Sequence, residues 1–134
     1  VSEDKKACAL ILYPQKKQTT PISIWLDLKL IFSAIGFWNI KKALTRESLI
    51  SKLKPKREMV YLWFVGVEPD HQHKGLGSKM LKEILDEAKL KNLPVFLETS
   101  TLSNIPWYEQ FGFQIYNELD LGYTVFFLKN EHAK

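Results

Sequence analysis

The chain has 134 residues, one cysteine and a formal net charge of +4, and 46% of its residues are hydrophobic. This length and composition predict one globular domain. The single cysteine, Cys8, excludes an internal disulfide, so we expect a cytoplasmic protein. The positive charge suits a polyanionic ligand, but no basic run interleaved with aromatic residues indicates a nucleic-acid partner.

The first part of the chain predicts one strand and two helices. The apolar run at residues 6–13 is typical of a strand. Residues 24–35 predict a helix that Gly36 interrupts. Thr45 is the expected N-cap of a short second helix, which Pro55 ends.

Residues 22–38 form an aliphatic run that invites comparison with a membrane span. The run is shorter than the ~20 apolar residues that a spanning helix needs, and it carries Asp27 and Lys29. We therefore interpret it as a core-facing helix or a lid over an active site. Basic residues follow the run, so contact with a membrane surface stays open as the less favoured alternative.

The second half of the chain alternates strands and helices. Residues 75–91 predict a helix, because apolar residues recur on one face at helical spacing; these are Leu76, Met80, Leu81, Ile84, Leu85 and Ala88. The elements expected around this helix are strands at residues 60–67 and 95–98, a short helix at 104–111, and a closing pair of strands at 113–118 and 123–128.

The segment between the strand at 60–67 and the helix at 75–91 carries the most specific motif. Gly75 and Gly77 open the helix, where backbone N–H groups without helical partners and the helix dipole favour an anion. Residues without a Cβ also let a phosphate approach the backbone. The spacing does not fit a P-loop, and Met80 occupies the third small position of a dinucleotide fingerprint. We interpret the segment as a pyrophosphate cradle.

A second motif lies downstream. Residues 94–100 (Pro-Val-Phe-Leu-Glu-Thr-Ser) predict a buried strand, and residues 104–113 read Asn-Ile-Pro-Trp-Tyr-Glu-Gln-Phe-Gly-Phe. With Gln-x-x-Gly-x-Gly at residues 72–77, this order resembles the GNAT superfamily of acetyl-CoA-dependent N-acetyltransferases. The resemblance is to the branch with an Asn-x-Pro-x-Tyr-Glu-x-x-Gly-Phe signature, and it covers about residues 59–128.

The resemblance implies an α+β fold, with a mixed, mostly antiparallel sheet and helices on both of its faces. Residues 1–134 would form one GNAT domain, with an acetyl-CoA-binding core at about 60–128 and a helical insertion at about 19–59. By this resemblance, we expect the strand and helices that open the family fold to be absent or severely shortened here. We therefore expect a truncated chain, or an acceptor groove completed by the insertion, by a homodimer partner or by another chain.

The resemblance also implies which residues bind acetyl-CoA. Backbone groups of Val65 and Val67 would contact the pantetheine arm between two splayed strands. Gly66 between them suits a bulge or a close backbone approach, or merely weakens the strand. The pyrophosphate would rest on N–H groups of the loop and the first helical turn, at Gln72, His73, Lys74, Gly75, Leu76, Gly77 and Ser78. The Gln72 side chain would bind phosphate or orient the loop, and His71 is expected to face solvent.

Tyr108 matches the family tyrosine near the CoA sulfur and is the predicted general acid, with a purely structural aromatic as the alternative. Asn104 matches the asparagine that bonds the pantetheine amide, or caps the helix, and both roles can hold. The general base is not identified. Glu98 is the nearest carboxylate, Tyr61 occupies the position where some relatives carry glutamate, and ordered water is a further route. Glu109 is expected to face solvent or a salt bridge.

We therefore expect an enzyme that moves the acetyl group of acetyl-CoA to a primary amine of a small molecule or peptide. No metal is expected, because the three scattered histidines form no metal-ligand pattern. A non-catalytic CoA sensor or interaction module on the same fold is the alternative, favoured by the missing front segment and the missing Glu base. A protein of the membrane surface is the third candidate.

Overall fold

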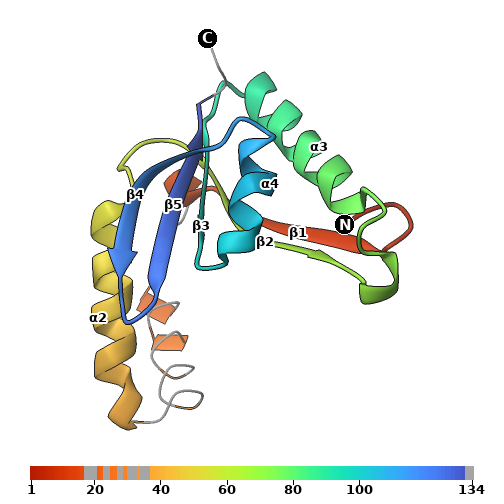
Figure 1. The fold of residues 1–134 in the computed structure, drawn as a ribbon. Helices are drawn as coiled ribbons and strands as arrows, with labels where there is room; N and C mark the ends of the chain where they lie inside the picture. The colour runs from red at the N-terminus through yellow and green to blue at the C-terminus, as the bar shows by residue number, and fades with distance from the viewer. Residues whose placement is uncertain (17–20, 23–24, 27–28, 30–32, 34–36, 132–134) are drawn as a thin grey trace. The chain divides into compact units, whose positions relative to one another are not determined.

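The computed structural model describes residues 1–16, 21–22, 25–26, 29, 33 and 37–131 (Figure 1). The chain divides into two compact units, of which one combines Val1–Gln15 with Arg57–Lys134 and the other is Lys16–Lys56. The second unit has nearly the bounds of the predicted insertion at 19–59. Most of the helix predicted at 24–35, with its interruption at Gly36, lies outside the described residues.

The first unit holds a five-stranded sheet with the strand order β1-β2-β3-β5-β4. Its strands are β1 (Ala7–Leu12), β2 (Val60–Val67), β3 (Val95–Thr99), β4 (Gln114–Asp120) and β5 (Thr124–Asn130). Only β2 and β3 run parallel, and the other neighbours are antiparallel. The predicted mixed, mostly antiparallel sheet is therefore confirmed. The described helices are α2 (Phe37–Leu53), α3 (Leu76–Leu90) and α4 (Ile105–Glu109), with short 3-10 helices at Pro14–Lys16, Pro69–His71 and Leu102–Asn104.

The prediction that Thr45 caps a short helix is wrong. Thr45 lies inside α2, and its hydroxyl donates to the Lys41 carbonyl at 2.8 Å. A threonine inside a helix often satisfies its hydroxyl in this way, so the residue type alone does not distinguish a cap from a helix interior. The predicted end is close, because α2 stops at Leu53, two residues before Pro55.

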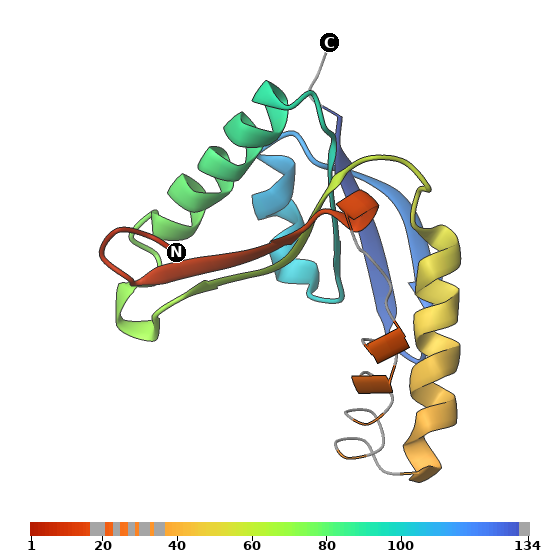
Figure 2. The same cartoon turned by 180° about the vertical axis from the view of Figure 1, so that it is seen from behind.

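The hydrophobic core of the first unit lies between α3 and one face of the sheet. Figure 2 shows α3 running beside β1 and β2, as in the opposite view. The predicted apolar stripe is buried at Met80, Leu81, Ile84, Leu85 and Ala88. It joins Val60, Leu62, Val95, Leu97, Phe113 and Leu128 in one cluster. Because side chains alternate along a strand, Tyr61 and Phe96 lie on the other face, in a second cluster with Met59 and Tyr116.

The strands β2 and β3 part after a short parallel ladder. Their pairing ends where Leu62 faces Leu97, and the rest of each strand pairs only with its outer neighbour. Against β1, Leu10 faces Phe64 and Ile11 faces Leu62, so Trp63 is an extra residue on β2. Such a bulge bends the strand that carries it.

The expected bulge at Gly66 is therefore wrong, because the irregularity lies at Trp63 and Gly66 pairs regularly with Cys8. The close approach expected there comes from a side chain. A Cβ at Gly66 would lie 2.6 Å from Cε1 of Phe64. The glycine thus leaves room for the Phe64 ring, which covers the same face of β2.

The Gly-Phe end of the second motif has a structural reason. Gly112 has φ +84°, a left-handed conformation that side chains disfavour. Around it, the N–H groups of Phe111 and Phe113 donate to the Tyr108 carbonyl at 3.0 and 3.3 Å. The buried Asn130 side chain donates to the Phe111 carbonyl at 2.7 Å. This turn ends α4, returns the chain to β4 and buries Phe113 in the core.

Replacing Gly112 with alanine is expected to destabilise the fold more than the same change at Gly122. Both glycines have a positive φ, which costs an alanine about 1–2 kcal/mol. A Cβ at Gly112 would also lie 3.4 Å from Asn130 Nδ2, at the tight limit of ordinary contact, whereas at Gly122 it meets open space. Urea unfolding of Gly112→Ala and Gly122→Ala measures the difference. Equal midpoints for the two variants would contradict the role given to Asn130.

Candidate functional site

A cavity of about 310 Å³ opens between the end of β2, the loop before α3 and the helix α4. Its wall comes from elements far apart in the sequence, which the sheet and core bring together (Figure 1). The lining residues are Val65, Val67, His71, Gln72, His73, Gly75, Leu76, Gly77, Ser78, Asn104, Trp107 and Tyr108.

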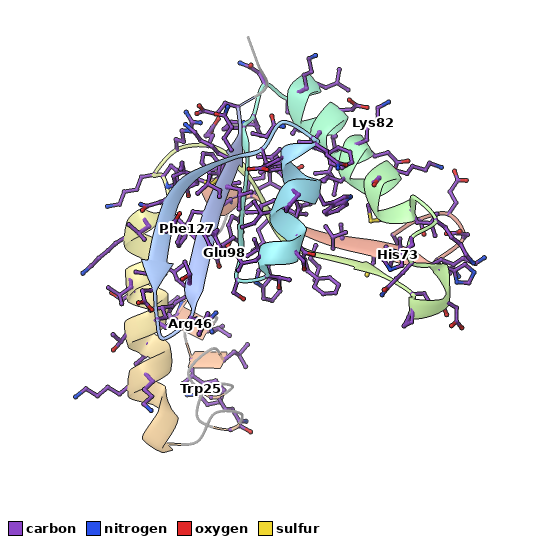
Figure 3. The ribbon with its side chains drawn as sticks, viewed as in Figure 1. Trp25, Arg46, His73, Lys82, Glu98 and Phe127 are labelled. Atoms are coloured by element: carbon purple, nitrogen blue, oxygen red, sulfur yellow. The ribbon has the colours of Figure 1, made fainter. Side chains whose placement is uncertain are left out.

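Most of the predicted site residues line this cavity, and three do not. Gly66 pairs with Cys8 on β1. Lys74 Nζ donates to the Asp70 carbonyl of its own loop at 2.9 Å, and Glu98 lies on β3. Figure 3 shows His73 in the loop before α3, well separated from Glu98. Two lining residues, His71 and Trp107, were not predicted. Their only sequence signal is their position beside motif residues.

Two residues with left-handed backbone conformations shape the loop before α3. His73 has φ +58° and Gly75, the N-cap of α3, has φ +80°. Left-handed residues that alternate with others in this way turn successive N–H groups toward one point. The first helical hydrogen bond runs from the Lys79 N–H to the Gly75 carbonyl at 2.9 Å. The N–H groups of residues 76–78 precede that bond and so have no partner within the helix.

The Gln72 side chain bonds back to the end of β2, and His71 lies beside it in the same loop. Gln72 Nε2 donates to the Val67 carbonyl at 3.2 Å, which supports the loop-orienting alternative for this residue. His71 Nδ1 lies 3.1 Å from a carboxylate oxygen of Glu68. His71 is half-buried rather than free in solvent, because it closes the short 3-10 turn after β2.

The backbone of β2 presents polar groups to the region where β2 and β3 part. The Glu68 N–H donates to the Lys6 carbonyl, beyond the end of β1, at 2.8 Å. Because backbone groups alternate between the two edges of a strand, the groups of Gly66 also face β1, and those of Val65 and Val67 face the opposite edge. No strand pairs with that edge beyond Leu62 among the described residues. The polar groups of Val65 and Val67 are thus directed toward the cavity that both residues line.

Tyr108 lies in the cavity wall with an aromatic cluster around it. Its ring centroid is 4.9 Å from that of Trp107 and 5.7 Å from that of Phe113. Burial raises the pKa of the Tyr108 phenol. The group therefore stays protonated at neutral pH and can donate a proton or a hydrogen bond.

Trp107 ties α4 to the first turn of α3. Its indole Nε1–H donates to Ser78 Oγ at 3.1 Å. A Cβ at Gly77 would lie 3.5 Å from Val67 Cγ2 and 3.6 Å from Trp107 Cζ2, which is ordinary van der Waals contact. A side chain at residue 77 would thus point toward Val67 and Trp107, whereas a Cβ at Gly75 would meet no atom within 4 Å.

Asn104 occupies the N-cap position of α4, but its side chain makes no capping hydrogen bond. The exposed Asn104 amide lines the cavity instead. Of the two roles that the sequence left open for this side chain, capping is therefore absent from the structure.

Glu98 is the first residue of β3 after its last pair with β2. Alternation along β3 places its side chain on the face of Phe96, opposite the core under α3. Burial, together with the charge of Glu98, raises the pKa of Tyr116 on that face to about 12. Glu98 thus lies where the strands part, on the opposite face of the sheet from the cavity.

Within the described ranges, no three His, Cys, Asp or Glu side chains gather as a metal site would require. The same residues include no helix with the length and apolarity needed to cross a membrane.

Comparison with known proteins finds one matching family. The sequence profile described as the acetyltransferase (GNAT) family matches residues 10–113. An uncharacterized N-acetyltransferase of Schizosaccharomyces pombe is 43% identical over 53 residues, which are 40% of this chain and 22% of the yeast protein. The match therefore spans less than a quarter of that relative's length.

Solved structures share the fold. Arabidopsis thaliana Naa50, in complex with the bisubstrate analogue CoA-Ac-MVNAL, has a TM-score of 0.50 at 23% identity, over 55% of this chain and 54% of its own. The histone acetyltransferase HPA2 and related acetyltransferase of Corynebacterium glutamicum has a TM-score of 0.54 at 20% identity, over 61% and 46%. An acetyltransferase of Bacillus cereus has a TM-score of 0.50 at 16% identity, over 85% and 94%.

Proposed function

Because the chain belongs to the acetyltransferase (GNAT) family, we propose that the cavity binds acetyl-CoA and that the protein transfers the acetyl group to a primary amine. The observation that carries this proposal is the cavity itself. It combines an anion-binding turn, an unpaired strand edge and a protonated tyrosine in one wall. The acceptor is an amine of a small molecule or a peptide, and the exposed thiol of Cys8 suits the reducing cytoplasm.

The turn before α3 fits the diphosphate of CoA. Its N–H groups at residues 76–78 have no helical partner, and the left-handed Gly75 aims the preceding backbone at the same place. An anion there would also gain from the positive end of the α3 dipole. Lys74 adds positive charge near the turn, and neither its side chain nor that of His73 is a required contact.

The parted strands fit the pantetheine arm. An extended, amide-containing chain can pair with the free edge of β2 through the backbone of Val65 and Val67. The Gln72 side chain already bonds the Val67 carbonyl, so the pairing uses the remaining groups of this edge. We assign to Asn104 a hydrogen bond to an amide of the arm, because its side chain makes no capping bond and lines the cavity.

Acetyl transfer requires a neutral amine and a protonated leaving thiolate. Acetyl-CoA supplies the thioester carbonyl that the amine attacks. We assign Tyr108 as the general acid for the thiolate, because it lines the cavity and burial keeps its phenol protonated. Glu98 is the proposed base. From its position on the face of the sheet opposite the cavity, it would accept the amine proton directly or through water.

The activity is tested by following release of free thiol from acetyl-CoA over a panel of polyamines, aminoglycosides, amino acids and N-terminal peptides. We expect acceptor-dependent release with at least one class of amine. Calorimetric binding of CoA without release over the whole panel would instead support a non-catalytic CoA-binding module. Absence of CoA binding would overturn the proposed function.

Tyr108→Phe is expected to lower the turnover number by about a hundredfold, the typical contribution of a general acid. The change keeps the ring that packs on Trp107 and Phe113, so the affinity for CoA should change little. Steady-state kinetics and calorimetry separate the two effects. An unchanged turnover number would show that the acid assignment is wrong.

Gly75→Val is expected to abolish CoA binding, while Gly77→Ala retains it. Gly75 has φ +80°, which valine disfavours by about 1–2 kcal/mol, so the variant should redirect the N–H groups of the turn. Alanine at residue 77 makes only ordinary contacts and raises helix propensity, so we expect equal or higher thermal stability. Calorimetry with CoA and thermal melts provide both readouts. Equal loss of binding in the two variants would contradict the distinction between the glycines.

A further inference from the structure

We propose that the Ser78 hydroxyl is a further donor to the diphosphate and that Trp107 is the positioning residue that fixes it in that role. The inference rests on the proposed binding of CoA to this cavity. Both residues line the cavity and both are half-buried, so a ligand that fills it comes within their reach. Ser78 is the third residue of α3, and the predicted contact at this position was its backbone N–H alone.

The direction of one hydrogen bond determines what the serine can do. The indole N–H of tryptophan is a donor only, so in the Trp107–Ser78 bond, at 3.1 Å, the serine oxygen must accept. The hydroxyl hydrogen is then available for another partner. An anion accepts hydrogen bonds and donates none, so it matches a serine held in this way.

The usual partner of a helical hydroxyl lies outside α3 for Ser78. A hydroxyl within a helix often donates to the carbonyl four residues earlier, as Thr45 does to Lys41, but four residues before Ser78 is Lys74, which precedes α3. Among the residues that the structure describes, Trp107 provides the one hydrogen bond to the Ser78 side chain. The Ser78 hydroxyl and its own N–H therefore belong to the same unsatisfied helical turn.

Trp107 is held firmly enough to act as a positioning residue. Its ring packs on Tyr108 at 4.9 Å and on Phe111 at 5.6 Å between centroids. The indole reaches Ser78 beside Gly77, where a Cβ would lie 3.6 Å from Trp107 Cζ2, at ordinary contact distance. The diphosphate contact on α3 and the proposed acid on α4 are thereby linked through one side chain.

Calorimetry of CoA with Ser78→Ala, Trp107→Phe and the double variant tests the inference. Ser78→Ala should weaken CoA binding about tenfold, which is the size of one hydrogen bond to a charged group. Trp107→Phe keeps an aromatic ring, so we expect a smaller loss of about threefold. The double variant should bind CoA no more weakly than Ser78→Ala, because Trp107 acts through Ser78. Ser78→Thr keeps the hydroxyl and should recover part of the lost affinity.

A spectroscopic readout separates positioning from a merely structural role. When a hydroxyl donates to an anion, its oxygen becomes a better acceptor, so the Trp107 indole proton should move downfield in the NMR spectrum as CoA binds. Trp107→Phe identifies this resonance among those of the four tryptophans. Pantetheine, which lacks the diphosphate, should leave the resonance in place and should bind the wild-type protein and Ser78→Ala equally.

The outcomes distinguish this inference from the function on which it rests. If the wild-type protein binds CoA but Ser78→Ala binds it equally well, or the indole resonance does not move at saturation, the inference is overturned and the proposed function stands. If the wild-type protein does not bind CoA, both are overturned.

Discussion

The parting of β2 and β3 is the constraint on which the candidate site depends. A parallel ladder that continued past Leu62 and Leu97 would satisfy the edge of β2 and leave no polar backbone for a ligand. Directly after the last pair of the ladder, β2 carries one residue more than β1 requires, and such a bulge at Trp63 bends the strand away from regular pairing. The core under α3 anchors the paired half of both strands, so the separation occurs on only one side of Leu62.

The helix α4 is short, and its position depends on contacts at both ends. At its C-terminal end, the turn through Gly112 and the Asn130 side chain connects it to the sheet. Along its length, Trp107 connects it to α3. Tyr108 lies between these attachments, and its backbone carbonyl takes part in the turn while its ring lines the cavity. The same residue thus serves the architecture and the proposed chemistry, and the two alternatives that the sequence offered for it are compatible.

Sequence reasoning succeeded where a pattern had a single physical cause. The apolar stripe of α3 and the approximate positions of the strands along the chain followed from periodicity, and the family resemblance of the two motifs implied the mixed, mostly antiparallel sheet. It failed at Thr45 because a threonine suits a cap and, by bonding the Lys41 carbonyl, also a helix interior. It failed elsewhere because the cause was tertiary: the position of the bulge at Trp63 depends on the register with β1, and the bond from Trp107 to Ser78 joins residues 29 positions apart. None of these leaves a local signal in the residue types.

The extra residue in β2 also determines which of its side chains point to each face of the sheet. Counted by strict alternation from Val60, Phe64 and Gly66 would point toward α3, and Val65 and Val67 would point away. Trp63 and Phe64 are instead both exposed, which restores the valines to the inner layer. A variant without Trp63 would keep Val65 and Val67 on the inner face but would lose the bulge. Its β2 and β3 would then be able to pair along their whole length. The identity of the side chains that line the cavity and the separation of β2 from β3 are thus two properties that could be altered independently in redesign.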